Sequence, residues 1–328
     1  MSRFRVVITD FTEPSHEVER EVFARSGIDI ELVGAHASRE LGLRAATAGA
    51  HALLVQFATI DADLIATLHD CRVISRYGVG VDMVDLDAAG AAGIPVSNVP
   101  DFCIDEVSTQ TIGFLIDLNR RTIQLDRHVH EKRWGAAPPV TAPRRLNCQT
   151  LGVIGLGAIG REVARKAQAL GLTVLAHDPF AQPGASSGVE LVTLSELLAR
   201  SDFVTLHCPL NSATRGLIGP AELSSMKPTA YLLNLSRGPV VDQAALVEAL
   251  GSGRLAGAAL DVLEAEPPDP DDPLLALDNV IITPHSSSWS VESSLQLRRD
   301  AAQNVIAVLF GAPPRSVVNG PQLRPRSR

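Results

Sequence analysis

Three side chains that can move protons or hold an anion follow apolar runs in the second half of the chain. Arg237 follows AYLLNLS, Glu266 follows LAGAALDVLEA, and His285 follows VIITP. An imidazole exchanges protons near neutral pH, and a guanidinium can bind a carboxylate through two parallel hydrogen bonds. Each residue alone has an ordinary alternative: Arg237 as a surface ion-pair partner, Glu266 as a solvated loop acid, and His285 as a surface histidine or a metal ligand.

The segment TLGVIGLGAIG (150–160) has the pattern of a strand that turns into a helix around a dinucleotide. Gly155 permits the tight turn, Gly157 lets the backbone approach a pyrophosphate, and Gly160 lets the helix pack close to the strand. The helical pattern REVARKAQALG follows, and its first N–H groups would face the pyrophosphate. Glycines in this spacing also serve simple turns, but the strand before and the helix after predict dinucleotide binding.

Asp178 stands at the end of the next strand-like run, TVLAH, 23 residues after Gly155. Its carboxylate can accept hydrogen bonds from the adenine ribose hydroxyls, and it would repel a 2′-phosphate. The residues that follow, PFAQPG, contain no arginine to bind that phosphate. The sequence therefore predicts NAD rather than NADP as the cofactor, with Asp178 as a simple turn or cap residue as the alternative.

Arg237, Glu266 and His285 all follow short apolar runs that favour buried strands. In a doubly wound sheet, ligands bind at the carboxyl ends of the strands. We therefore expect Arg237, Glu266 and His285, with Asp261 after the middle run, to converge beside the nicotinamide.

The composition is that of a globular protein of about two domains. The chain has 328 residues, of which 45% are hydrophobic and 20% charged, and its net charge is −8. This charge argues against a general nucleic-acid surface, and no apolar run approaches the roughly 20 residues that span a bilayer. The cysteines, Cys71, Cys103, Cys148 and Cys208, form no CxxC pair and predict neither disulfides nor a metal site. Because the N-terminus lacks a signal-peptide pattern, we expect a cytoplasmic protein.

The order of strand-like and helix-like segments predicts one domain inserted in another. Strands are expected at 4–9, 28–33, 51–57, 72–77 and 95–99. A long amphipathic stretch at 105–131, with Asp105 as its N-cap, and a surface connection at 132–150 precede a second alternating series. A helical segment at 291–311 follows that series, so the chain would return to its first domain.

Six segments in this order resemble the NAD-dependent D-isomer-specific 2-hydroxyacid dehydrogenases, the family that includes phosphoglycerate dehydrogenases and the C-terminal-binding-protein corepressors. They are YGVGVDMVDLDAAGAAGIPV, GLGAIG, LHCPLNSATRGLIG, NLSRGPVVD, GAALDVLEAEP and TPHSSS. The resemblance implies an α/β fold with two doubly wound parallel sheets. A Rossmann NAD-binding domain (105–289) would be inserted in a flavodoxin-like substrate domain (1–104 and 290–328), and the inserted domain would form a homodimer.

The resemblance also implies the reaction, a hydride transfer between NAD(H) and a 2-keto or D-2-hydroxy acid. Arg237 would bind the substrate carboxylate and carbonyl, and His285 would be the acid/base that Glu266 orients and stabilises in its protonated form. Asp261 matches the position that bonds the nicotinamide carboxamide, and Cys208 and Pro209 would border the adenine. The implied cofactor-binding set is Gly155, Gly157, Ala158, Ile159, Gly160, Asp178, His207, Cys208, Pro209, Thr214, Leu235, Ser236, Arg237, Asp261, His285 and Ser287.

The segment SRYGVGVD (75–82) resembles the substrate loop of the family. Backbone N–H groups near Val79 and Gly80 would hold the carboxylate, and Arg76 would face an anionic or extended substrate. The implied substrate-binding set is Arg76, Tyr77, Val79, Gly80, Arg237 and His285. Tyr77 departs from the small residue that many phosphoglycerate enzymes carry there, which leaves the shape of the pocket open.

Two other classes of protein fit parts of the pattern. An NAD(H)-sensing interaction protein, like the corepressors, would carry the same Arg237, Glu266 and His285 but turn over little substrate. A different Rossmann enzyme, such as a relative of homocysteine hydrolase, would need further catalytic signatures that the sequence lacks. The partner expected is therefore a small 2-keto or 2-hydroxy acid, with no nucleic acid and no membrane.

Overall fold

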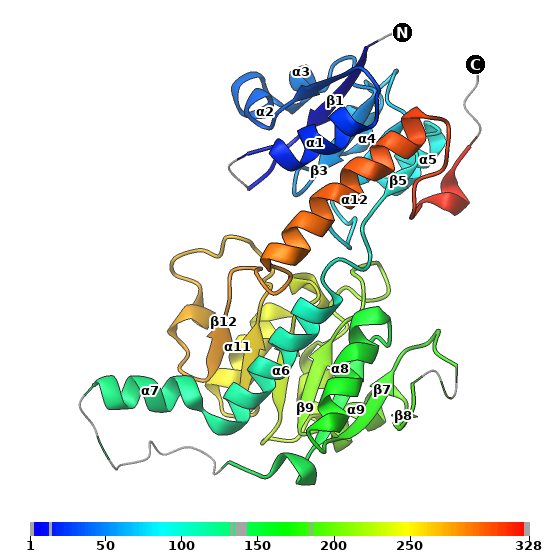
Figure 1. Ribbon diagram of the computed structural model, residues 1–328. Coiled ribbons are helices and arrows are strands. Elements are labelled where there is room, and N and C mark those ends of the chain that lie inside the picture. Colours follow the sequence, from blue (N-terminus) through cyan, green and yellow to red (C-terminus); the bar gives the residue numbers. More distant parts are fainter. Residues whose placement is uncertain are drawn as a thin grey trace. The chain divides into compact units, whose positions relative to one another are not determined.

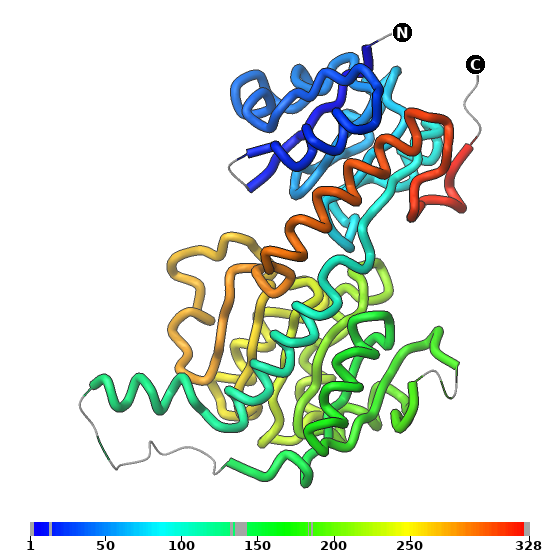
Figure 2. Tube along the Cα trace, viewed as in Figure 1, coloured from blue at the N-terminus to red at the C-terminus, as the bar shows by residue number. Residues whose placement is uncertain are grey.

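The computed structural model describes residues 3–12, 15–131, 134, 143–182, 184 and 186–324. The chain divides into two compact units. The first unit comprises Met1–Phe102 and Ser290–Arg328, and the second comprises Cys103–Trp289. The chain therefore leaves the first unit once and returns to it once, as the path in Figure 2 shows.

The first unit contains a five-stranded sheet in which every strand pair is parallel. Its strands are β1 (Phe4–Ile8), β2 (Ile30–Val33), β3 (Ala52–Val55), β4 (Val73–Arg76) and β5 (Val96–Ser97). Their order across the sheet is β2-β1-β3-β4-β5, the flavodoxin-like order. Each strand lies within one of the five segments where the sequence predicts a strand, so this part of the fold is confirmed.

Helices cover the sheet of the first unit, and one of them comes from the C-terminal segment. The helices are α1 (Glu17–Arg25), α2 (His36–Leu41), α3 (Leu43–Ala46), α4 (Ala62–Ile65), α5 (Leu86–Ala91) and α12 (Val291–Leu309). The helices α1 and α12 pack side by side, and α12 also contacts β3 and β4 (Figure 1). Because the strands between the helix layers are apolar, Val7, Leu53 and Ile74 are fully buried.

The second unit contains a seven-stranded sheet, again with every strand pair parallel. Its strands are β6 (Thr150–Ile154), β7 (Thr173–His177), β8 (Val189–Leu191), β9 (Phe203–Leu206), β10 (Tyr231–Asn234), β11 (Gly257–Leu260) and β12 (Val280–Ile282). The order β12-β11-β10-β9-β6-β7-β8 is the Rossmann order extended by one strand, and it reverses between β6 and β9. The predicted fold class is therefore confirmed for both sheets.

The helices of the second unit are α6 (Ile104–Arg120), α7 (Thr122–His130), α8 (Ala158–Ala169), α9 (Leu194–Arg200), α10 (Pro220–Ser225) and α11 (Gln243–Gly251). The helices α6 and α8 lie side by side over one face of the sheet (Figure 1). In the described part of the chain, no helix has both the length and the apolar composition that a membrane crossing requires.

The amphipathic stretch at 105–131 differs from the prediction in two respects. It is divided at Arg121, whose φ of 58° ends α6 and starts α7, and the Arg121 guanidinium donates to the Tyr231 hydroxyl at 3.0 Å. Asp105 is not the N-cap, because α6 begins at Ile104 and the Asp105 carboxylate accepts a hydrogen bond from Lys166 Nζ at 2.6 Å. Most of the surface connection expected at 132–150 lies outside the described residues.

Candidate active site

The glycine turn between β6 and α8 is built so that two of its positions admit no side chain. Gly155 has a φ of 92°, and a Cβ atom there would lie 2.7 Å from the backbone nitrogen of Cys208. A Cβ atom at Gly160 would lie 2.0 Å from the carbonyl oxygen of Gly155. These contacts show why the strand, the turn and the helix can approach so closely only with glycine at both positions.

Gly157 differs from these two glycines, because a Cβ atom there would meet nothing within 4 Å. The residue occupies the N-cap position of α8, with Ala158 and Ile159 in the first helical turn. The first N–H groups of a helix have no acceptor within the helix and carry its positive dipole end. The open space at Gly157 therefore lies where a pyrophosphate would be bound, so the turn fits a dinucleotide.

Asp178 follows β7 and is held beside the same turn. Its Oδ2 accepts a hydrogen bond from the Leu156 N–H, and its Oδ1 accepts one from the Phe180 N–H, both at 2.8 Å. Since an ionised carboxylate can accept about four hydrogen bonds, acceptor capacity remains for two ribose hydroxyls. The position and charge of Asp178 thus suit an unphosphorylated ribose.

The segment 207–214, which follows β9, lies against Gly155 of the glycine turn and carries no charged side chain at neutral pH. Burial lowers the pKa of His207 to about 3, so its imidazole is uncharged at neutral pH. Burial, assisted by the charge of Asp178, raises the pKa of the Cys208 thiol to about 11. The Thr214 hydroxyl donates to the carbonyl of Pro209 at 2.6 Å and stabilises the loop. A neutral wall of this kind suits an adenine ring.

A buried asparagine that the sequence did not single out fixes the backbone at Arg237. Asn234, the last residue of β10, donates from Nδ2 to the Arg237 carbonyl at 2.9 Å and accepts from the Ser236 N–H at 3.1 Å. Leu235 and Ser236 connect the two residues, and the next residue, Gly238, packs against Leu263, where a Cβ would lie 1.8 Å from the Leu263 oxygen. The signal available in the sequence was a polar residue inside the apolar run AYLLNL.

Asp261 follows β11 and is bonded to the loop that carries His285. Its Oδ1 accepts from the Ser286 N–H at 2.9 Å and from the Thr283 hydroxyl, and its Oδ2 accepts from the Ser287 N–H at 3.0 Å. Its carbonyl accepts from the His285 N–H at 2.8 Å. The buried Asp261 carboxylate therefore fixes the loop Thr283–Ser287, a role that the sequence did not suggest.

His285 has a φ of 51°, a left-handed conformation that is uncommon for a residue other than glycine. Its Nδ1 lies 2.7 Å from Glu266 Oε2, and the other oxygen of Glu266 accepts from the Leu263 N–H at 3.0 Å. The carboxylate thus assigns Nδ1 as a donor, and Nε2 becomes the ring nitrogen that can exchange a proton with a substrate. The two side chains are only partly buried, so a substrate can reach them.

Glu266 is ionised at neutral pH, because the groups around it favour its charged form. Burial raises the pKa of Glu266, but the hydrogen bond and charge of His285, the Leu263 N–H and the charge of Arg237 outweigh it and lower the pKa overall. The structure therefore brings Arg237, Glu266 and His285 into electrostatic reach at the carboxyl ends of β10, β11 and β12. Among the described residues, no three His, Cys, Asp or Glu side chains form a metal-ligand group.

The predicted substrate residues of the first unit lie at and directly after the carboxyl end of β4, whose last residue is Arg76. The Arg76 guanidinium lies against Gly78, where a Cβ would be 1.2 Å from Arg76 Nη1. Asn98 Nδ2 donates to the Val79 carbonyl at 2.6 Å, next to Gly80. Tyr77 is the exception, because its side chain is 2% exposed and its hydroxyl donates to Glu19. In this structure only the backbone of Tyr77 is placed to meet a ligand.

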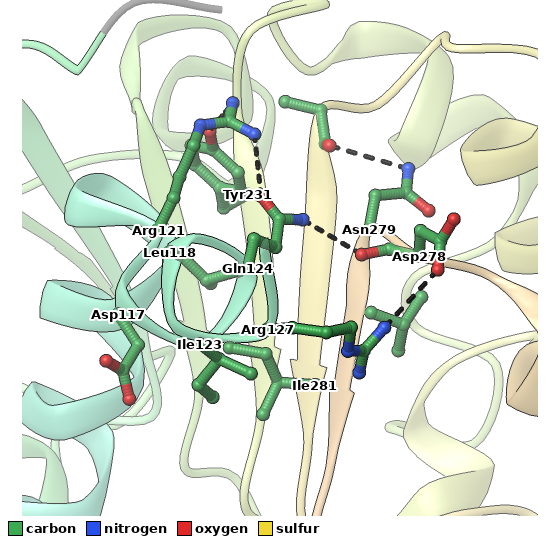
Figure 3. A pocket seen from close by; sticks show the side chains of 12 residues that line it. Asp117, Leu118, Arg121, Ile123, Gln124, Arg127, Tyr231, Asp278, Asn279 and Ile281 are labelled. Atoms are coloured by element: carbon green, nitrogen blue, oxygen red, sulfur yellow. Dashed lines mark hydrogen bonds and ion pairs between the residues drawn. The ribbon is translucent and has the colours of Figure 1, made fainter. Parts of the chain in front are cut away.

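The second unit also contains a pocket, shown in Figure 3, at the other end of the strands that precede the candidate site. It is lined by the amino ends of β10 and β12 and by the junction of α6 and α7, whereas Arg237 and His285 follow the carboxyl ends of the same strands. Figure 3 shows two contacts to Asp278: Gln124 donates to the Asp278 carbonyl at 2.9 Å, and Arg127 lies 3.5 Å from the Asp278 carboxylate. These contacts anchor the start of α7 to the sheet.

The chain is similar to known proteins over most of its length. Residues 112–287 match the family described as "D-isomer specific 2-hydroxyacid dehydrogenase, NAD binding domain". A glyoxylate reductase from Korarchaeum cryptofilum is 40% identical over 264 residues, which are 79% of this chain and 80% of the reductase. A D-3-phosphoglycerate dehydrogenase from Archaeoglobus fulgidus is 38% identical over 95% of this chain, but the chain spans only 59% of that protein's length.

A solved structure gives the same result for the fold. The NADPH-dependent glyoxylate/hydroxypyruvate reductase from Sinorhizobium meliloti, in complex with NADP and malonate, superposes with a TM-score of 0.87 and 30% identity. The superposition covers 100% of both chains.

Proposed function

Because the chain belongs to the D-isomer specific 2-hydroxyacid dehydrogenase family, we propose that it is an NAD-dependent oxidoreductase that interconverts 2-keto acids and D-2-hydroxy acids. The observation that carries the proposal is the hydrogen bond between His285 Nδ1 and Glu266 Oε2, with the charge of Arg237 close to the same carboxylate. A proton donor, its orienting carboxylate and a carboxylate-binding guanidinium are the groups that reduction of a 2-keto acid requires.

In reduction, Arg237 would bind the substrate carboxylate and polarise the adjacent carbonyl. His285 would donate the proton on Nε2 to the carbonyl oxygen, and in oxidation the same nitrogen would accept the proton of the hydroxyl. Glu266 would hold the ring in this tautomer and stabilise its positive charge. NADH, when bound, supplies the hydride that reaches the α-carbon of the substrate.

The cofactor would be held by the residues around the glycine turn. Gly157, Ala158 and Ile159 would offer space and N–H groups to the pyrophosphate, and Asp178 would accept from the adenine ribose. His207, Cys208, Pro209 and Thr214 would border the adenine. Leu235, Ser236, Asp261 and Ser287 would lie near the nicotinamide, where Asp261 would act mainly by holding the Ser286 and Ser287 N–H groups in place.

On the substrate side, the N–H groups near Val79 and Gly80 would bind the carboxylate, and Arg76 would favour an anionic or extended substrate. Tyr77 would contribute through its backbone, since its side chain is buried. We propose NAD over NADP because Asp178 would repel a 2′-phosphate, although the Sinorhizobium meliloti reductase uses NADPH.

The test is the consumption of NADH by purified protein across a panel of small, branched, aromatic and phosphorylated 2-keto acids. Rapid turnover of one member, with formation of the D-hydroxy product, would support the proposal and identify the substrate class. Tight NADH binding without turnover of any member would contradict it and would favour the NAD(H)-sensing protein.

We further propose a cytoplasmic homodimer that associates through the second unit. The support is the surface of α7, on which three large apolar side chains, Ile123, Leu125 and Val129, are exposed. Light scattering of the purified chain should give twice the monomer mass, and replacement of Leu125 by a charged residue should yield monomers.

A further inference from the structure

A network of buried side chains connects the predicted substrate loop to the C-terminal helix α12. Tyr77, which precedes the loop glycine Gly78, donates its hydroxyl proton to Glu19 Oε1 of α1 at 3.1 Å. Arg298 of α12 binds the same carboxylate with two hydrogen bonds, from Nε to Oε1 at 2.9 Å and from Nη2 to Oε2 at 2.7 Å. Two residues far apart in the sequence, Tyr77 and Arg298, therefore share the carboxylate of Glu19.

The environment of this carboxylate is almost dry. The side chain of Glu19 is fully buried and that of Arg298 is 7% exposed. Arg298 also donates from Nη2 to the Ser15 carbonyl at 2.6 Å and lies over the Phe11 ring, which packs against Tyr77 with ring centroids 4.8 Å apart. Because burial of an ion pair costs free energy, apolar residues could stabilise the packing equally well; a buried pair with complete hydrogen bonds is suited to specifying one conformation.

A second connection reaches the other side of Gly78. Asn304 of α12 donates from Nδ2 to the Asn98 carbonyl at 3.3 Å, and Asn98 Nδ2 donates to the Val79 carbonyl at 2.6 Å. The Ser316 hydroxyl donates to Asn98 Oδ1 at 2.7 Å and fixes the orientation of that amide. The residues before and after Gly78 are thus both tied to α12 or to the segment that follows it.

Gly78 makes such support necessary. Its φ of 139° belongs to a region that other residues rarely adopt, and glycine itself moves easily between this region and others. The Gly78 carbonyl accepts from the Val99 N–H at 3.0 Å, and the side-chain contacts on both flanks further restrict the direction of the N–H groups near Val79 and Gly80. Loss of these contacts would leave the loop less ordered. A ligand carboxylate would then have to order the loop on binding, which weakens the binding.

We propose that Arg298 and Glu19, acting through the Tyr77 hydroxyl, are positioning residues that hold the Tyr77–Gly80 loop in the conformation that binds the substrate carboxylate. Asn98 supports the loop from its other side. The inference rests on the proposed function for the identity of the ligand, and it assigns substrate affinity to a helix that follows the second unit in sequence.

The decisive variant is Tyr77→Phe, which keeps the buried ring and removes only the hydroxyl. Ser75→Ala is its matched control, because Ser75 lies within β4, before the Tyr77–Gly80 loop, and its hydroxyl donates to the Ala301 carbonyl at 3.0 Å and so also joins β4 to α12. Arg298→Lys keeps the charge but loses the two-pronged hydrogen bonding to Glu19. Two measurements apply to all three variants: the kinetics of 2-keto acid reduction and the hydrogen exchange of peptides that cover residues 75–82.

For Tyr77→Phe and Arg298→Lys we expect KM for the 2-keto acid to rise about tenfold with kcat nearly unchanged, because the carboxylate is bound in both the ground and transition states. Hydrogen exchange of the 75–82 peptides should become faster in both variants, whereas Ser75→Ala should match the wild type in both measurements. If Arg298→Lys does not fold, Tyr77→Phe alone tests whether the network positions the loop.

Unchanged KM and unchanged exchange in Tyr77→Phe would overturn the inference, and so would an equal effect of Ser75→Ala, which would indicate loosened packing of α12. A wild-type protein that reduces no 2-keto acid would instead contradict the proposed function. In that case hydrogen exchange is the remaining measurement. Faster exchange of the 75–82 peptides in Tyr77→Phe, but not in Ser75→Ala, would still show that the network positions the loop.

Discussion

The imidazole of His285 and the carboxylate of Glu266 are 2.7 Å apart although the residues are separated by 19 positions in the chain. If His285 is the acid/base, His285→Ala should lower kcat by about 1,000-fold, the middle of the range for loss of a general acid. Binding of NADH, followed by fluorescence, should be nearly unchanged, because the glycine turn and Asp178 do not depend on the imidazole.

The chain offers a matched control for that variant. His130 on α7 also forms a pair with a carboxylate, 3.4 Å from Asp126, but both side chains are exposed. His130→Ala should therefore retain wild-type turnover. Near-normal turnover of His285→Ala would exclude His285 as the proton donor.

The lowered pKa of Glu266 predicts a definite pH dependence of stability. Because the pKa in the folded protein lies below the ordinary value of 4.5, ionised Glu266 stabilises the folded state above that value, and the stabilisation is lost as the pH falls through the lowered pKa. The difference in Tm between the wild type and Glu266→Gln should thus be present at about pH 5 and should shrink as the pH falls through the lowered pKa.

The neighbouring acid supplies the control for this titration. Glu264 is exposed, and Glu264→Gln should have the same Tm as the wild type throughout. A difference for Glu266→Gln that already disappears near neutral pH would mean that the carboxylate is not held ionised by His285 and Arg237.

Replacement of Gly157 and replacement of Gly160 should have different effects, the first on cofactor binding and the second on stability. Gly157→Ala should fold with a Tm close to that of the wild type, since the added Cβ meets no atom within 4 Å, but it should bind NADH weakly because the methyl occupies the pyrophosphate position. Gly160→Ala should lose about 1–3 kcal/mol of stability, because its Cβ would be forced against the Gly155 carbonyl. Thermal unfolding and NADH titration of both variants check this, and normal NADH affinity in Gly157→Ala would be inconsistent with the proposed cofactor position.

Asp178 should determine the preference between the two nicotinamide cofactors. The wild type should bind NADH about 100-fold more tightly than NADPH, and Asp178→Ser should bring the affinities within about tenfold, because a like-charge contact with the 2′-phosphate is removed. Glu190→Gln is a suitable control, since Glu190 is an acidic residue of the same unit that pairs with Arg200 at 2.8 Å. Equal affinities in the wild type would reject the role of Asp178.

The sequence predicted the strands well because their signal is local. Each apolar run of β1, β3, β4 and β6 is bounded by polar or turn residues, and the alternation with helices implies parallel order. The weakest strand, β8, has three residues that are at best partly buried, so its pattern could not be distinguished from a loop. The break at Arg121 was also hidden, because the residues on both sides have helical composition and no glycine or proline marks the turn.

The sequence predicted which residues belong to the candidate site, but it predicted only some of the contacts between them. The pairing of Glu266 with His285 and the proximity of Arg237 follow from strands that end at one edge of a sheet. The contacts of Asp261 with Ser286 and Ser287 depend on the path of a loop, which spacing alone does not define. The pairing of Glu19 with Arg298 spans 279 positions, and no local pattern indicates it.

Because the chain returns to its first unit at the end, the two units become complete at different times during synthesis. The second unit is continuous and complete once Trp289 has been made, whereas the first unit needs α12 and Asn319, whose side chain bonds the Val96 N–H at 2.8 Å. The residues translated first are therefore among the last to reach their native contacts. During that interval the apolar strands β3 and β4 lack the cover of α12, and exposed apolar strands favour aggregation, while the unit proposed to bind NAD already has all of its residues.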